Sequence, residues 1–286
     1  MEQTFETPGH LQLELQIPAG TIRIRAEETA QTHVSISGER TPDAVRIAFD
    51  DVGQDGHRLA IEYRERGKLF GWGGSEMRVD LTVPIGTAVA CDTGSADLDM
   101  KGRVGTLSFR SGSGNCRFDD VDGDVNVTVA SGDLVGVAVG GGLSFHSASG
   151  DARVREVGRD AGGKSASGDV TLGTVAGSVR LATVSGNVQI GSVAMGSTSV
   201  RSVSGNVEIA VARGTRVYLD IGSTSGDTVS ELDMSDPSTG GGPDLDLQVN
   251  TVSGDIRIVR GPARPSSAPG DASEPAYAAE DSTSSE

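Results

Sequence analysis

Apolar and polar residues alternate along most of this chain, and beyond residue 87 the alternation recurs in blocks of 18 residues. Each block holds two apolar pairs. Val170 and Leu172 form one pair, and Val179 and Leu181 form the other. Apolar residues at positions n and n+2 lie on the same face of a β-strand. The pattern therefore predicts two short strands in each block, each with one buried face.

A Ser-Gly-Asp/Asn tripeptide marks the end of each block. In five consecutive copies, 18 residues apart, the serine is Ser113, Ser131, Ser149, Ser167 and Ser185. Ser95-Ala96-Asp97 stands one block earlier, with alanine in place of glycine. Three later copies are spaced more widely and begin at Ser204, Ser225 and Ser253. The wider spacing indicates regular coils that accept loop insertions, with the strands at 245–249 and 256–258 completing the last coil.

Repeats of this length predict an all-β fold, a parallel β-solenoid (β-helix), because a single coil cannot bury its apolar face without neighbours. We expect a right-handed solenoid, since the hexapeptide pattern of the left-handed type is absent. Residues 1–86 are strand-rich but aperiodic and are expected to cap the solenoid domain at 87–260. Residues 261–286 are rich in Pro, Ser, Ala and acidic residues, which predicts a disordered acidic tail.

Composition narrows the function. The chain has 40 acidic and 24 basic side chains, a formal charge of −16, which disfavours nucleic-acid binding. Aromatic residues make up only 3%, so the core must consist mainly of Val, Ala, Leu and Ile. No signal peptide and no apolar stretch of about 20 residues is visible, so we expect a cytoplasmic protein without a membrane span.

The Asp/Asn position of the tripeptide is the first candidate for chemistry. Its members are Asp97, Asn115, Asp133, Asp151, Asp169, Asn187, Asn206, Asp227 and Asp255. A ladder of oxygen ligands for Ca²⁺ is one interpretation. However, Ca²⁺ takes six to eight oxygens, and this column supplies one side chain per coil. We therefore favour a structural turn ladder, in which Ser and Asx side chains satisfy backbone amides.

A glycine-rich stretch near residue 70 is the second candidate. Phe70 and Trp72 lie in it, and Arg64 and Arg66 precede them. Exposed aromatic residues beside arginine are typical anchors for a partner, which makes this stretch a possible partner-binding loop. The alternative, which we favour, is a hydrophobic lid over the open end of the solenoid.

Catalytic and cofactor motifs are absent from the sequence. It contains no GxSxG, no HExxH and no phosphate-binding glycine loop. His146 follows the inward-facing Phe145, so its side chain is expected to point outward. Cys91 and Cys116 fall in different columns, so we expect no disulfide between them. The sequence predicts neither an enzyme nor a cofactor or metal site.

These features resemble the DUF4097 family of adhesin-like, β-strand repeat-containing proteins. The resemblance covers about residues 10 to 260 and rests on Ile17-Pro18-Ala19-Gly20, Val83-Pro84-Ile85-Gly86 and the run of Ser-Gly-Asx-Val motifs. It implies a parallel β-solenoid with a surface or interaction role and no catalytic residues. The family label makes the cell surface the alternative to a cytoplasmic location.

Together these observations predict a non-enzymatic scaffold, an adhesin-like module that binds a protein partner. One alternative is a carbohydrate-active enzyme on a β-solenoid, which would need clustered carboxylates and aromatic sugar platforms. Another is an extracellular rod stabilised by calcium. The sequence leaves the identity of the partner and the oligomeric state open.

Overall fold

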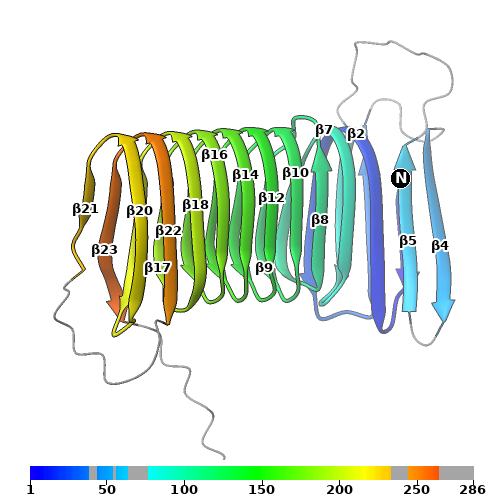
Figure 1. The fold of residues 1–286 in the computed structure, drawn as a ribbon. Helices are drawn as coiled ribbons and strands as arrows, with labels where there is room; N and C mark the ends of the chain where they lie inside the picture. The colour runs from blue at the N-terminus through cyan, green and yellow to red at the C-terminus, as the bar shows by residue number, and fades with distance from the viewer. Residues whose placement is uncertain (39–43, 54–55, 64–76, 233–243, 264–286) are drawn as a thin grey trace, which may run out of the picture.

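The computed structural model describes residues 1–38, 44–53, 56–63, 77–232 and 244–263. These residues form strands and no helix, so none of them lies in a helix able to cross a bilayer. The strands stack side by side along one axis into an elongated body, with β4 near one end and β21 at the other (Figure 1).

The strands form two faces that enclose the core. The first face consists, in spatial order, of β4 (Val45–Gly53), β5 (Gly56–Tyr63), the first half of β2 (His10–Glu27), the first half of β7 (Ala88–Val104), β8 (Thr106–Ser111), β10 (Val125–Ser131), β12 (Leu143–Ser149), β14 (Ala161–Ser167), β16 (Val179–Ser185), β18 (Gly196–Ser204), β22 (Leu245–Ser253) and β20 (Val217–Ser225).

The second face follows the same axis. It consists of β1 (Glu2–Glu6), β3 (Gln31–Ser37), β6 (Met77–Pro84), the second halves of β2 and β7, β9 (Cys116–Val121), β11 (Leu134–Val139), β13 (Ala152–Val157), β15 (Val170–Val175), β17 (Val188–Val193), β19 (Val207–Arg213), β23 (Ile256–Ala263) and β21 (Thr228–Ser230).

Pairing within the repeat region is parallel, and it joins equivalent positions of successive coils. Leu134 pairs with Ala152, and Ala152 pairs with Val170 on the next coil. All three side chains are buried. Backbone pairing thus builds one continuous core out of small apolar columns, as the 18-residue period predicts, and the β-solenoid prediction is confirmed.

Two inward-facing glycines make room for aromatic rings. A Cβ atom added at Gly136 would lie 2.2 Å from the ring of Phe118, and one added at Gly163 would lie 2.2 Å from the ring of Phe145. In both cases the ring belongs to the preceding coil and fills the space above the glycine. Each glycine thus offsets the large ring of the coil before it, which keeps the core filled at constant coil spacing.

The last coil in the sequence is not the last coil in space, which corrects the prediction for residues 245–258. Strand β22 pairs with β18 on one side and with β20 on the other, and β23 likewise lies between β19 and β21. The segment 217–230 is therefore the outer coil. Leu247 is fully buried, whereas the equivalent Leu219 of the outer coil is only half-buried.

At the amino-terminal end, too, the order of the strands in space differs from their order in the sequence. Strand β2 lies between β5 and β6 on its outer side and β7 on its inner side. Beyond β5 and β6, the antiparallel strands β4 and β3 follow, and β1 is added to β3. Phe5 of β1 and Phe49 of β4 meet with their ring centroids 5.1 Å apart, so an aromatic contact joins the two faces there. The division at residue 86 stays a prediction.

Candidate functional site

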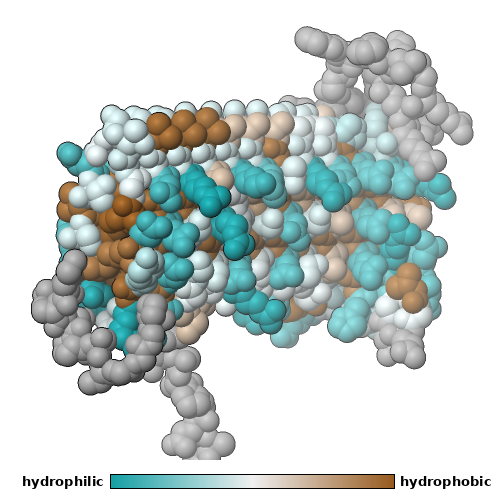
Figure 2. Space-filling model, in the orientation of Figure 1, coloured by the Kyte–Doolittle hydropathy of each residue, from teal (hydrophilic) through white to brown (hydrophobic). Residues whose placement is uncertain are grey.

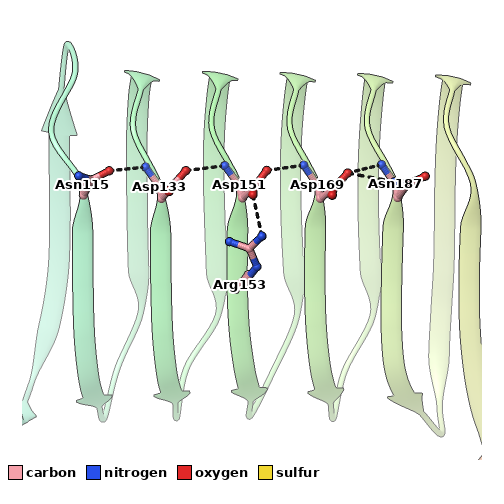
Figure 3. A network of polar contacts seen from close by, with 6 residues as sticks. All are labelled: Asn115, Asp133, Asp151, Arg153, Asp169 and Asn187. Atoms are coloured by element: carbon pink, nitrogen blue, oxygen red, sulfur yellow. Dashed lines mark hydrogen bonds and ion pairs between the residues drawn. The ribbon is translucent and has the colours of Figure 1, made fainter.

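The Asx side chains form a hydrogen-bonded ladder along one corner of the solenoid (Figure 3). In every member except Asp227 of the outer coil, the Oδ1 atom accepts a hydrogen bond from the backbone N–H of the equivalent residue on the next coil. The distance is 2.9 Å from Asp133 Oδ1 to Asp151 N and 2.8 Å from Asp151 Oδ1 to Asp169 N. Asn187 N lies 2.8 Å from Asp169 Oδ1. One oxygen per coil is thereby committed to the backbone.

The ladder follows the coils in space rather than in sequence. Asp255 N donates to Asn206 Oδ1 at 2.9 Å, and Asp227 N donates to Asp255 Oδ1 at 2.9 Å. The order at this end is therefore Asn206, Asp255, Asp227, in agreement with the order of the strands. Asn and Asp serve equally here because both present an acceptor oxygen.

At Asp151 an arginine side chain joins the ladder. The pKa of Asp151 lies below its ordinary value, mainly because its carboxylate accepts the hydrogen bond from Asp169 N, and partial burial opposes this effect. The Arg153 guanidinium also lowers the pKa, since its Nη2 donates to Asp151 Oδ2 at 2.6 Å. Within the described residues, no group of three or more His, Cys, Asp or Glu side chains could hold a metal ion.

The other sequence candidates have different surroundings. Arg64, Arg66, Phe70 and Trp72, the expected binding loop or lid, lie outside the described residues. His146 is exposed on the first face, as its position after Phe145 predicts.

Both cysteines are buried and free. Burial raises the pKa of the Cys91 thiol to about 12 and also raises the pKa of Cys116. A thiol needs to ionise before it can attack an electrophile. Neither cysteine is therefore placed to act as a nucleophile.

A surface that the sequence analysis missed lies on the first face. Strands β8, β10, β12, β14, β16 and β18 contain no Asp or Glu. Their charged or titratable side chains are Arg110, His146, Lys164, Arg180 and Arg201, all of them exposed. We call this surface, defined by those five residues, the cationic face. The sequence contains a signal for this surface, because basic residues occur within these strands and acidic residues occur in the corners between them. Only the stacking of the strands brings the cations together.

A row of exposed aliphatic side chains borders the cationic face. Each member immediately precedes the serine of a tripeptide, and the row consists of Ala130, Ala148, Ala166, Val184, Val203 and Val252. We call it the aliphatic ridge. Val184, Val203 and Val252 are 53%, 49% and 52% exposed, although apolar residues of a strand usually turn inward. Figure 2 shows hydrophobic side chains gathered along the upper edge of the first face, over the ends of these strands.

A shallow hollow of about 430 Å³, which we call the trough, runs between the cationic face and the aliphatic ridge. One side is lined by His146, Lys164 and Ala182, and the other by Ala148, Ala166 and Val184. A second hollow of about 300 Å³ lies across the same face, where Gly162 and Ser144 leave space beside Arg180. Asp124 and Asp160 border this second hollow at the opposite corner.

Comparison with known proteins agrees with this architecture. The family model described as Toastrack DUF4097 matches residues 10–259. The chain belongs to the Toastrack DUF4097 family. The matched Toastrack region contains the Asx ladder, the cationic face and the aliphatic ridge. No curated protein matches the sequence.

Several solved structures are similar to this Toastrack chain. A protein of Bacteroides fragilis NCTC 9343, provisionally described as an adhesin, is 14% identical with a TM-score of 0.46, covering 91% of this chain and 96% of its own. A protein of Parabacteroides distasonis ATCC 8503, provisionally described as lipid-binding, is 11% identical with a TM-score of 0.42 over the same shares. These descriptions belong to those proteins.

Proposed function

We propose that this Toastrack chain is a non-enzymatic, adhesin-like scaffold that binds a protein partner along the side of its solenoid. The observation that supports the proposal most is the first face itself. It carries exposed side chains in register over successive coils, with cations and aliphatic groups in separate rows. Surfaces of this kind suit an extended contact, whereas enzyme sites are usually concave and enclose the substrate.

The chemistry of the repeated polar residues supports the same proposal. One oxygen of the Asx side chain, Oδ1, accepts a hydrogen bond from a backbone N–H group at 2.8–3.0 Å on every coil of the ladder except the outer one. The role of these oxygens is therefore to hold coils together. The outward side chains that remain exposed are available to a partner.

Photo-crosslinking in the native host tests the proposal. A photoreactive residue is placed at outward positions of both faces in turn, and adducts are identified by mass spectrometry. We expect a recurrent protein adduct from one face that disappears when excess unlabelled chain competes. The absence of such an adduct from every position, or sugar release from polysaccharide substrates by the purified chain, would contradict the proposal.

A further inference from the structure

We infer that the trough between the cationic face and the aliphatic ridge binds an extended acidic peptide whose carboxylates alternate with small aliphatic side chains. This inference rests on the proposed function, and it adds the surface and the chemistry of the partner.

The first argument is the unsatisfied charge of the face. Lys164, Arg180 and Arg201 form no ion pair within the part of the chain that the structure describes, and their strands contain no acid. Strands of the second face such as β9 and β13 do contain Asp or Glu, and three arginines of that face, Arg103, Arg153 and Arg257, pair with carboxylates. Arg110 is the one paired cation of the cationic face, with Asp92 at 3.8 Å. The chain as a whole carries −16 charge, so the absence of acids from six strands is a local feature. Carboxylates of a partner complement this face.

The second argument is the position of the cations along the rod. Register places His146 beside Lys164, Lys164 beside Ala182, and Ala182 beside Arg201. Neighbouring strands lie about 4.8 Å apart, so Lys164 and Arg201 are separated by about 10 Å. Arg180 lies in the parallel row, next to Gly162. Their spacing fits a ligand with several anionic groups better than it fits a single small anion.

The third argument is the aliphatic ridge beside the cations. Its six members occupy successive coils, so its length is about 24 Å, the span of about seven extended residues. Three valines at one end and three alanines at the other offer contacts to methyl-sized groups. On the far side of the ridge lies the acidic corner with Asp133, Asp151 and Asp169. That corner repels carboxylates, so a bound acidic peptide is oriented with its carboxylates toward the cationic face.

The surface favours a peptide over other anionic polymers. Bases of single-stranded nucleic acids bind by stacking on aromatic side chains. The described outward residues of β8 to β18 on this face include no Phe, Tyr or Trp. The hollow is open and shallow, so it cannot enclose an acyl chain as small-ligand pockets do. An extended peptide, in contrast, presents both carboxylates and methyl groups to an open trough.

Fluorescence anisotropy with the purified full chain tests this inference. The probe is a labelled twelve-residue peptide with Glu alternating with Val or Ala. Two control probes carry Lys in place of Glu, or Ser in place of Val and Ala. We expect saturable binding of the acidic aliphatic probe, and weaker binding of both controls. Binding of the Lys probe as tight as that of the acidic probe would overturn the inference, as would no binding of the acidic probe.

Charge-reversal variants locate the contact. The variant Lys164→Glu/Arg180→Glu/Arg201→Glu is expected to bind the acidic probe at least about tenfold more weakly, a change of about 1.4 kcal/mol. The matched control Arg117→Glu/Arg155→Glu/Arg213→Glu changes the charge equally on the second face and is expected to bind as the wild type does. Equal loss in both variants would overturn the inference. The milder Lys164→Gln/Arg180→Gln/Arg201→Gln variant gives the same comparison if the reversal variant does not fold.

The ridge has its own test in the same assay. The variant Val184→Ser/Val203→Ser is expected to weaken binding of the aliphatic probe while leaving binding of the Ser probe unchanged. Tighter binding of heparin or of an oligothymidylate than of the acidic peptide would overturn the choice of partner.

These outcomes are distinct from those of the crosslinking experiment. A host protein that crosslinks from the second face and still binds the Lys164→Glu/Arg180→Glu/Arg201→Glu variant would overturn the trough inference but support the proposed function. Binding of the acidic peptide without any crosslinked host protein would support the trough as a peptide site but contradict the proposed function.

Discussion

Gly168 shows what the turn tripeptide requires of its middle residue. Its φ is +124°, and an added Cβ atom would lie 2.2 Å from the carbonyl oxygen of Gly150 on the preceding coil. Both the backbone conformation and the contact exclude a side chain. Ala96 holds the same position in an earlier copy, where strand β7 continues from the first face to the second without a break in its strand conformation.

We expect Gly168→Ala to lower the free energy of unfolding by about 1–3 kcal/mol, since it combines a positive φ with a backbone clash. Gly162→Ala on the adjacent strand is the matched control. The nearest atom to its added Cβ is Leu143 O at 3.9 Å, so no loss is expected. Urea denaturation measures both variants, and an equal effect of the two substitutions would contradict the account of the turn.

Asp151 links the ladder to pH. A group whose pKa is lowered on folding stabilises the fold above its unfolded pKa, and this contribution disappears as the pH falls. The stability of the wild type relative to Asp151→Asn should therefore decrease as the pH falls below the ordinary Asp value of about 3.9. Denaturant titrations at pH 7 and pH 3 measure the difference. A constant difference would show that Asp151 does not contribute in this way.

Asp151→Ala separates the acceptor from the charge. It removes the oxygen that binds Asp169 N, whereas Asn keeps it, as Asn115 and Asn187 do elsewhere in the ladder. We expect the alanine variant to be less stable than the asparagine variant at pH 7 by about 1 kcal/mol, the usual contribution of a hydrogen bond.

At the scale of the elements, strands β12 and β14 pack as a complementary pair. The ring of Phe145 occupies the space that a side chain at position 163 would need. Glycine therefore appears in an apolar column, where the repeat pattern alone indicates a bulky residue. The neighbouring members of this column, Val127 and Leu181, are buried side chains of ordinary size.

We expect Gly163→Val to destabilise the protein by about 1–3 kcal/mol through overpacking against Phe145. The double variant Phe145→Leu/Gly163→Val restores a column of medium-sized residues and should be more stable than the sum of the single effects by about 1 kcal/mol. A thermodynamic cycle from chemical denaturation measures this coupling. Strictly additive effects would show that the two positions do not share the space.

At the scale of the whole molecule, the order of the coils separates position in the chain from position in the rod. Strand β22 has a neighbour on each side, and its inward residues Leu245, Leu247 and Val249 are fully buried. The outer coil, β20 and β21, pairs on one side only within the described residues. Its residues Tyr218 and Val229 are 58% and 50% exposed.

Native-state hydrogen exchange should reveal this order. We expect amides of residues 245–253 to exchange more slowly than those of 217–225, although they lie closer to the carboxyl terminus, because an outer strand opens without disturbing the core. Amides of β16 serve as an internal reference for a central strand. Slower exchange in β20 than in β22 would contradict the intercalated topology.

The sequence by itself determined the class of fold and the columns of the core. A strict 18-residue period with apolar pairs has one efficient solution, the stacking of equivalent positions, because each coil buries its apolar face only against its neighbours. The same period placed the Asx residues in a single corner column. These features are local in sequence and repeated, so pattern alone is enough to find them.

Only the tertiary structure decided the order of the coils at the two ends and the make-up of the outer surface, because both depend on contacts between coils of different sequence. The order of neighbouring strands is one such feature. Strands β22 and β23 lie beneath the outer coil, and β2 lies inside β5 and β6. These strands have similar apolar patterns, so the sequence spacing does not determine which of them are neighbours. The cationic face likewise arises from five strands of different coils, each with one basic or titratable side chain. Four of these side chains share one column of the repeat with Thr128 and Ala182, so they become a continuous surface only when the coils are stacked.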